Sequence, residues 1–258
     1  MIIKSILVTK RSVHFFVHLL VATLICFILP LRYGRHWAIN DKGQSITQWW
    51  SKRANKILGI NISQFGYPLT PNCLVSANHI SFLDIIVIGS MSPVIFLAKS
   101  SLQYWPVVGW IAISINTIFL QRSNKQVIFK AIYKISNILE QGQSCVIFPE
   151  GTTTIGSNVL KFHSGLFQSA INSKKPVQPV ALRYLKNGGI DRNAAYIEND
   201  NFIMTLVKIM AQKQTNVDLH ICKAIPTQTF NRNEIAKICH KRIQDRIYSH
   251  YFFKTETL

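Results

Sequence analysis

The most apolar stretch of the chain lies near its N-terminus. Residues 15–31 are hydrophobic apart from His18 and Thr23, and basic residues stand on both sides of them. A helix of about 17 residues is roughly 25 Å long, slightly shorter than the ~30 Å hydrocarbon core of a bilayer. The pattern predicts a membrane-anchoring helix that either spans the bilayer or lies in its interface, because positive charge at both ends leaves the orientation open.

A second helical pattern covers residues 44–58, where apolar side chains recur at helical spacing. It places Trp49 and Trp50 beside lysine and arginine, which suits a membrane interface and equally suits packing against a core. We expect residues 1–60 to form a membrane anchor with interfacial helices, and residues 61–258 to form the globular domain.

From residue 59 onward, strand-like and helix-like segments alternate. Strands are expected over 59–66, 73–77, 94–99, 117–121, 144–148, 177–184 and 217–224, and helices over 82–88, within 106–114, and over 125–140, 165–173 and 231–248. This alternation predicts an α/β fold with a mixed, largely parallel sheet flanked by helices.

Polar residues interrupt the apolar pattern at four places, over residues 76–84, 116–122, 148–154 and 161–165. Each group falls at the end of a predicted strand or in the turn after it. In open α/β sheets, ligands bind beyond the carboxyl ends of the strands. We therefore expect the four groups to contribute to one site.

The group at residues 76–84 has two interpretations. Ser81 and Asp84 have the spacing of a capping box, with Ser81 as the N-cap of the following helix. Alternatively, Asp84 orients His79 as a catalytic base. Residues five apart on one helix point about 140° apart, so His79 must precede the helix. The two interpretations compete for the Asp84 carboxylate.

Composition narrows the classes of partner. Lys and Arg number 29 against 11 acidic residues, giving a formal charge of +18 that attracts polyanions. The charge is spread along the chain and 48% of residues are hydrophobic, which favours membranes over nucleic acid. A non-catalytic basic protein that binds either of them remains an alternative.

Metal and disulfide chemistry find little support. The five cysteines are scattered, without a CxxC pair, so the sequence predicts neither a disulfide framework nor a zinc site. A metal-dependent hydrolase would need further ligands beside His79 and Asp84, and no second histidine or carboxylate cluster follows them. No metal is expected.

Four ordered blocks resemble the glycerolipid acyltransferase family over about residues 70 to 185. They are Asn78-His79-x-x-x-x-Asp84, Phe119-x-x-Arg122, Phe148-Pro149-Glu150-Gly151-Thr152 and Val177-x-Pro179-Val180. The resemblance implies transfer of an acyl group from acyl-CoA or acyl carrier protein to a hydroxyl of a membrane lipid, with no further cofactor. It also implies a membrane enzyme whose catalytic domain lies on the cytoplasmic side of a bacterial inner membrane.

The resemblance also implies roles for individual residues. His79 is the base and Asp84 its orienting carboxylate, and the acceptor and its phosphate are bound by Arg122, Glu150, Gly151 and Thr152. Residues 177–180 either contribute to the acyl-donor side or simply form a buried strand.

Two departures from the family pattern bear on the acceptor. Thr153 stands where the family often has arginine, and His163 where it has lysine, with Lys161 two residues earlier. Together with Asn78, these residues are possible acceptor-side contacts. The expected acceptor is 1-acyl-sn-glycerol-3-phosphate, giving phosphatidic acid. The loss of two positive charges keeps a headgroup-bearing lysophospholipid or lyso-ornithine lipid as the alternative.

Overall fold

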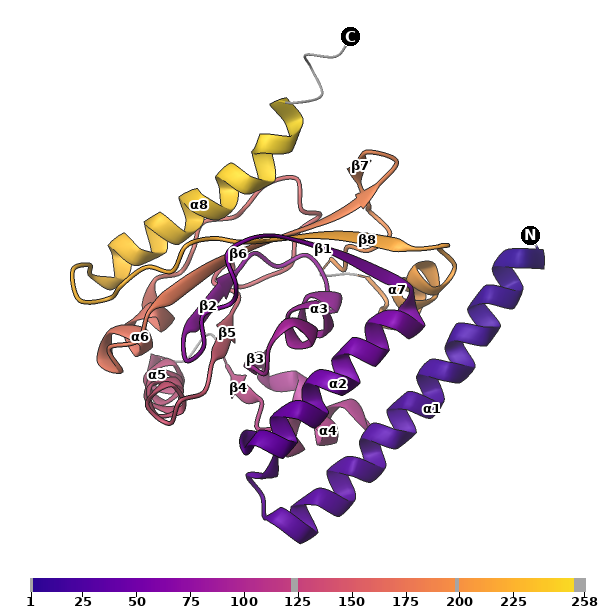
Figure 1. Cartoon of the computed structure of the whole chain (residues 1–258), viewed down its shortest axis with the longest axis horizontal. Helices are drawn as coiled ribbons and strands as arrows, with labels where there is room; N and C mark the ends of the chain where they lie inside the picture. The colour runs from indigo at the N-terminus through magenta and orange to yellow at the C-terminus, as the bar shows by residue number, and fades with distance from the viewer. Residues whose placement is uncertain (1, 122–124, 198–199, 253–258) are drawn as a thin grey trace.

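The computed structural model describes residues 2–121, 125–197 and 200–252 of the 258-residue chain. It begins with two helices, α1 (Ile2–Tyr33) and α2 (Asp41–Leu58), joined by the short 3-10 helix η1 (Trp37–Ile39) and lying to one side of the sheet (Figure 1). The Asn40 side chain caps α2 by accepting a hydrogen bond from the Gly43 N–H, and Gly59 ends it in the left-handed conformation at φ 73°.

The sheet has the strand order β1-β8-β6-β2-β5-β3-β4, with β7 paired to β6. Pairings of β6 with β7 and β8 are antiparallel, and the other pairings are parallel, which confirms the predicted mixed, largely parallel α/β fold. The strands are β1 (Ile60–Gly66), β2 (Leu74–Ala77), β3 (Ile95–Lys99), β4 (Ile118–Leu120), β5 (Cys145–Ile147), β6 (Val177–Lys186), β7 (Gly189–Ile190) and β8 (Thr215–Ile221).

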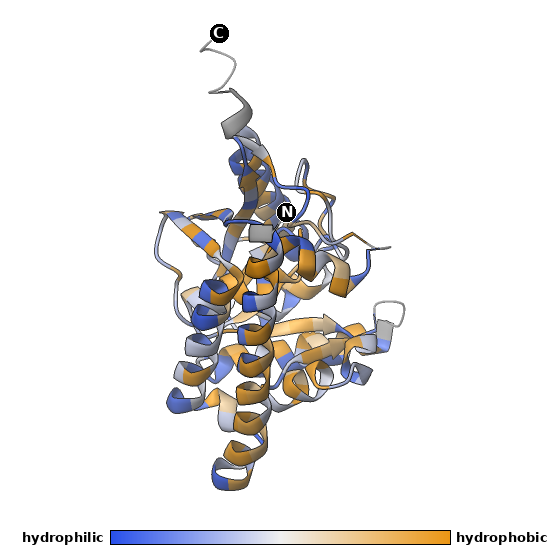
Figure 2. Cartoon of the chain, turned by 90° about the vertical axis from the view of Figure 1, so that its right-hand side faces the viewer, coloured by the Kyte–Doolittle hydropathy of each residue, from blue (hydrophilic) through white to orange (hydrophobic). Residues whose placement is uncertain are grey.

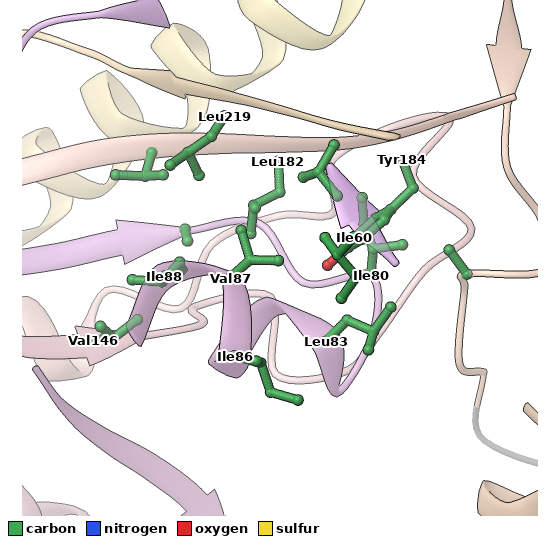
Figure 3. Close-up of a cluster of buried hydrophobic side chains, with 14 of the residues drawn as sticks. Ile60, Ile80, Leu83, Ile86, Val87, Ile88, Val146, Leu182, Tyr184 and Leu219 are labelled. Carbon is green, nitrogen blue, oxygen red and sulfur yellow. The ribbon is translucent and has the colours of Figure 1, made fainter. Parts of the chain in front are cut away.

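Helices cover both faces of the sheet (Figure 1). Alternate strand residues point to opposite faces, so Val75 and Val146 join one core with α2 and α3, whereas Leu74 and Cys145 join another with α5, α6 and α8. Figure 3 shows the first core around α3. The remaining helices are α3 (Leu83–Met91), η2 (Ser100–Tyr104), α4 (Val108–Ser114), α5 (Lys125–Glu140), η3 (Gly165–Phe167), α6 (Gln168–Asn172), α7 (Phe202–Met210) and α8 (Arg232–Phe252).

The predicted N-terminal apolar helix is present, and it lies along the domain. Arg11 donates hydrogen bonds to the carbonyls of Met210, Gln212 and Lys213, at the C-terminal end of α7, at 3.1, 2.6 and 3.0 Å. Further along α1, the buried His18 ring stacks on Trp50 of α2, with ring centroids 4.8 Å apart. One face of α1 is therefore fastened to both α2 and the segment that follows α7.

The opposite face of α1 is apolar and exposed, as the colouring of Figure 2 shows. Its large hydrophobic side chains are at least 47% exposed at Phe16, Val17, Leu20, Leu24, Phe27, Ile28 and Leu31. The helix is long and apolar enough to cross a membrane. Both tryptophans contact the His18 ring of α1, Trp50 by stacking and Trp49 by an edge contact at 5.7 Å between centroids, while Trp49 stays 47% exposed.

Candidate active site

His79 and Asp84 meet where β2 ends and α3 begins. His79 lies in the loop after β2, and Asp84 lies in the first turn of α3, fully buried. The Nδ1 atom of His79 is 2.7 Å from Oδ2 of Asp84. A carboxylate accepts at Nδ1, so Nδ1 carries the ring proton of a neutral imidazole, and Nε2 keeps the lone pair that can take a proton from a nucleophile.

Asp84 binds the loop as well as the ring. Its Oδ2 also accepts from the backbone N–H groups of Ile80 and Ser81, at 2.7 and 3.0 Å, and its Oδ1 accepts from the Tyr184 hydroxyl at 2.8 Å. We expected the His79 ring and the Ser81 backbone N–H to compete for this carboxylate, and that expectation is wrong. Asp84 accepts hydrogen bonds from both groups at the same time. The predicted capping role of Ser81 is also wrong, since α3 starts at Leu83 and the Ser81 hydroxyl has no partner among the described residues.

Glu150 fastens the His79 loop to the loop that follows β5. It is buried, and its Oε1 and Oε2 accept from the backbone N–H groups of His79 and Leu160 at 2.7 and 2.8 Å. Burial raises the pKa of the Glu150 carboxyl, and these two hydrogen bonds oppose the shift. Both oxygens are thus engaged by the protein backbone. The next residue, Gly151, turns the chain at φ 79°, a conformation that favours glycine.

The other predicted residues of these loops differ in exposure. Thr152, Lys161 and His163 are exposed, and Thr153 is half-buried. The backbone N–H of His163 donates to the Pro149 carbonyl at 2.9 Å, which brings the 161–163 segment back to the end of β5. The structure therefore gathers these side chains around the loop that carries Glu150. Arg122 lies outside the described residues.

Two other predicted segments are bound within the protein. Asn78 is buried, and its amide donates to the Leu182 carbonyl at 3.0 Å and accepts from the Leu182 N–H at 2.8 Å, which pins the His79 loop to β6. Residues 177–180 form a wholly buried part of β6, between β2 and β8. The aromatic ring of Phe148 stacks on the His79 imidazole, with centroids 4.0 Å apart.

Sequence reasoning missed Tyr184. It stands 100 residues from Asp84 in a strand where a tyrosine is an ordinary core residue, so no local pattern signals its contact with the carboxylate. Among the described residues, no group of three His, Cys, Asp or Glu side chains could hold a metal ion.

An apolar cavity of about 120 Å³ lies between α1, α2, α3, α4 and β3. Two of its lining residues, Ile85 and Ile86, directly follow Asp84 on α3, and Gly89 lies one turn further along the helix. Cys26, Trp37 and Phe96 contribute to the opposite walls. Neither His79 nor Asp84 lines the cavity, whose walls are mostly apolar.

Comparison with known proteins places this geometry in a family. The family model named Acyltransferase matches residues 60–183. The chain is 32% identical over 196 residues to the lyso-ornithine lipid O-acyltransferase of Pseudomonas aeruginosa, covering 75% of each chain. It is 38% identical over 123 residues to the 1-acyl-sn-glycerol-3-phosphate acyltransferase of Neisseria gonorrhoeae, covering 47% of this chain and 48% of that one.

A solved structure shares the fold along nearly the whole chain. The crystal structure of the 1-acyl-sn-glycerophosphate acyltransferase PlsC from Thermotoga maritima superposes with a TM-score of 0.70 at 21% identity, and covers 96% of each chain. The family model and these relatives agree. The chain belongs to the acyltransferase family of lysolipid-acylating enzymes.

Proposed function

We propose that this acyltransferase moves an acyl group from the thioester of acyl-CoA or acyl carrier protein to the free hydroxyl of a membrane lysolipid, with His79 as the base. The hydrogen bond from His79 Nδ1 to Asp84 Oδ2 carries this proposal, because it leaves Nε2 as the proton acceptor. No cofactor beyond the thioester donor is needed.

The proposed step is one acyl transfer. The acceptor oxygen forms a bond to the thioester carbonyl carbon as its proton passes to Nε2 of His79. The C–S bond then breaks, and the departing thiolate takes the proton from the imidazolium. Asp84 stays ionised and stabilises the charged ring. Because Asp84 already binds the N–H groups of Ile80 and Ser81, these two amides are not free to stabilise the oxyanion.

Of two candidate acceptors, we favour lyso-ornithine lipid. The relatives named for that substrate include the one matched over 75% of this chain, and Thr153 and His163 replace two fixed positive charges that a bare phosphate would use. The second candidate is 1-acyl-sn-glycerol-3-phosphate, supported by the higher identity, 38%, to the Neisseria gonorrhoeae enzyme over a shorter region of 123 residues.

The apolar cavity suits the acyl chain. A fatty acyl chain gains about 0.8 kcal/mol for each methylene taken from water. Ile85 and Ile86 of its lining follow Asp84 on α3, the helix that carries the proposed catalytic carboxylate.

We further propose that α1 lies in the membrane interface instead of crossing the bilayer. Arg11 and His18 fasten one face of α1 to the domain, and a spanning helix held this way would draw the domain into the hydrocarbon. Helices α4 and α7 contact α1 and carry further exposed apolar side chains, such as Ile113 and Met204. We place the domain on the cytoplasmic side of a bacterial inner membrane, where the acyl donors are available.

The decisive experiment is an acceptor panel. Lyso-ornithine lipid, 1-acyl-sn-glycerol-3-phosphate and lysophospholipids with larger headgroups are each offered in vesicles with the same acyl-CoA, then with acyl carrier protein as donor, and products are read by mass. His79→Ala is the inactive control. His36→Gln, which replaces an exposed histidine between α1 and α2, is the matched control and should keep its activity. Absence of product from every acceptor and donor, or full activity of His79→Ala, would remove the proposal.

A further inference from the structure

Tyr184 reaches the catalytic carboxylate from the side opposite His79. Its side chain, 2% exposed, extends from β6 toward Ile80 and the start of α3 (Figure 3). The hydroxyl donates to Oδ1 of Asp84 at 2.8 Å, and His79 binds the other carboxylate oxygen, Oδ2. Tyr184 therefore contacts the dyad without standing where a substrate could reach it.

One oxygen of the Asp84 carboxylate accepts more hydrogen bonds than the other. Oδ2 accepts from His79 Nδ1 and from two backbone N–H groups, whereas the Tyr184 hydroxyl is the donor to Oδ1. Asp84 is fully buried, so water cannot replace that donor without a rearrangement. The Tyr184 hydroxyl thus fixes the rotation of the carboxylate and withdraws part of its negative charge from the ring.

The titratable groups that face this carboxylate come from three elements. They are His79 in the loop after β2, Glu150 in the loop after β5 and Tyr184 on β6. Burial, and secondly the Asp84 charge, raise the pKa of the Tyr184 phenol well above its ordinary value, so it remains a donor throughout the working range of the enzyme.

We propose that Tyr184 is a positioning residue that acts through Asp84 and sets the pH at which His79 becomes a competent base. This inference rests on the proposed function of the dyad. A strong donor on Oδ1 weakens the stabilisation of the imidazolium by Asp84, which keeps the ring neutral at lower pH. Removing the donor strengthens the attraction between Asp84 and the charged ring, so the ring holds its proton to higher pH.

The test is Tyr184→Phe in the full-length protein. The acidic limb of kcat/KM against pH, followed from about pH 5 to pH 9, should move to higher pH by about 0.5–1 unit, with KM for acyl-CoA unchanged. Replacement of Tyr184 by 3-fluorotyrosine keeps the ring and hydroxyl but makes a stronger donor, so the limb should move the other way. This second variant preserves packing if Tyr184→Phe fails to fold.

Tyr196→Phe is the matched control. The Tyr196 ring packs against Phe82 in an edge-to-face contact, close to the same helix start, so its hydroxyl can be removed near Asp84 without touching the carboxylate. A double-mutant cycle with Asp84→Asn should show that Tyr184→Phe has no further effect once the carboxylate is gone.

A readout without turnover separates this inference from the proposed function. The His79 ring titration is followed by NMR, with His79→Gln identifying its signal, and its midpoint should rise in Tyr184→Phe even if no acceptor were acylated. An unchanged midpoint and acidic limb in Tyr184→Phe, or an equal change in Tyr196→Phe, would overturn the assignment.

Discussion

The Oε1 atom of Glu150 lies 2.7 Å from the backbone nitrogen of His79, and its other oxygen binds the backbone of Leu160. This one carboxylate connects two loops, with His79 and Glu150 71 residues apart in sequence. Its burial and full hydrogen bonding point to a role in fixing the catalytic base, whereas the family resemblance implies contact with the acceptor. The two roles make different kinetic predictions.

Glu150→Gln keeps the size of the side chain but supplies one carbonyl acceptor in place of two carboxylate oxygens. We expect kcat to fall by roughly 10- to 100-fold, as expected for about 1–3 kcal/mol from an unsatisfied buried N–H, with a smaller change in the KM for the lysolipid. Steady-state kinetics with each substrate varied in turn measures the change in kcat separately from the change in KM. A large rise in acceptor KM at unchanged kcat would instead indicate direct contact with the lysolipid.

The raised pKa of Glu150 also predicts a pH dependence of stability. The folded protein binds the Glu150 proton more tightly than the unfolded chain does. The resulting stabilisation is therefore fully present below the unfolded-state pKa of about 4.3, and it is lost as the pH rises through the folded-state pKa. The thermal stability of the wild type relative to Glu150→Gln should therefore decline as pH rises from about 4 to 7. Melting scans in detergent at matched ionic strength measure the difference. If the Tm of the wild type instead rose relative to that of Glu150→Gln with increasing pH, the raised pKa of Glu150 would be contradicted.

Thr153 and His163 should govern acceptor choice. The double variant Thr153→Arg/His163→Lys introduces two fixed charges, one at the half-buried Thr153 and one at the exposed His163. Because each charge-assisted contact with phosphate contributes about 1.5–3 kcal/mol, kcat/KM for 1-acyl-sn-glycerol-3-phosphate should rise at least tenfold relative to lyso-ornithine lipid. Competition assays with both acceptors in the same vesicles report the ratio. The exposed Lys174→Arg, on the loop before β6, is a charge-neutral control.

Arg11 should matter for stability through α1. Arg11→Ala removes three hydrogen bonds to the carbonyls that follow α7, and bonds of a charged donor are worth about 1.5–3 kcal/mol. For a protein of this size each kcal/mol corresponds to roughly 2–4 °C in Tm. We expect Tm in detergent to fall by several degrees, with Lys10→Ala, its exposed neighbour, near the wild type. Equal Tm values for the two variants would argue that α1 is held mainly by its apolar contacts.

Gly89 offers a test of the cavity. A Cβ at this position would lie 3.1 Å from Ser51 Oγ and 3.5 Å from a Phe96 ring carbon, so Gly89→Ala fits with a small adjustment and narrows the cavity. We expect activity with long acyl-CoA donors to decline relative to short ones, measured as a chain-length series. Gly189→Ala, where the nearest atom is 3.9 Å away, should leave that series unchanged.

Much of the architecture follows from local patterns. Helix α5 has the predicted bounds, since its apolar positions recur at helical spacing up to Gly142, and the parallel strands lie within a few residues of the predicted ranges. Helix α7 was not predicted. Its nine residues carry apolar side chains on the exposed side as well as the buried side, at Met204 and Ile209 for example, and the pattern of so short an apolar run does not distinguish a helix from a strand.

The site was predictable only in part. Spacing placed His79 before a helix and Asp84 within it, and the structure joins their side chains. Spacing could not show that Asp84 binds backbone amides with the same oxygen, or that Tyr184 supplies its other oxygen across 100 residues. Such contacts depend on the register of distant strands, which the local sequence does not encode.

The fastening of α1 has a consequence for biosynthesis. Arg11 and its acceptor at Lys213 are separated by 202 residues, which a ribosome adds in about 10 to 40 s at typical rates. During that interval α1 has emerged and can meet α2, but the carbonyl groups after α7 that bind Arg11 do not yet exist. The apolar face of α1 can then bind the lipid surface, so the nascent chain should reach the membrane before the domain is complete. The rest of the domain should then fold against a helix that is already bound to the membrane.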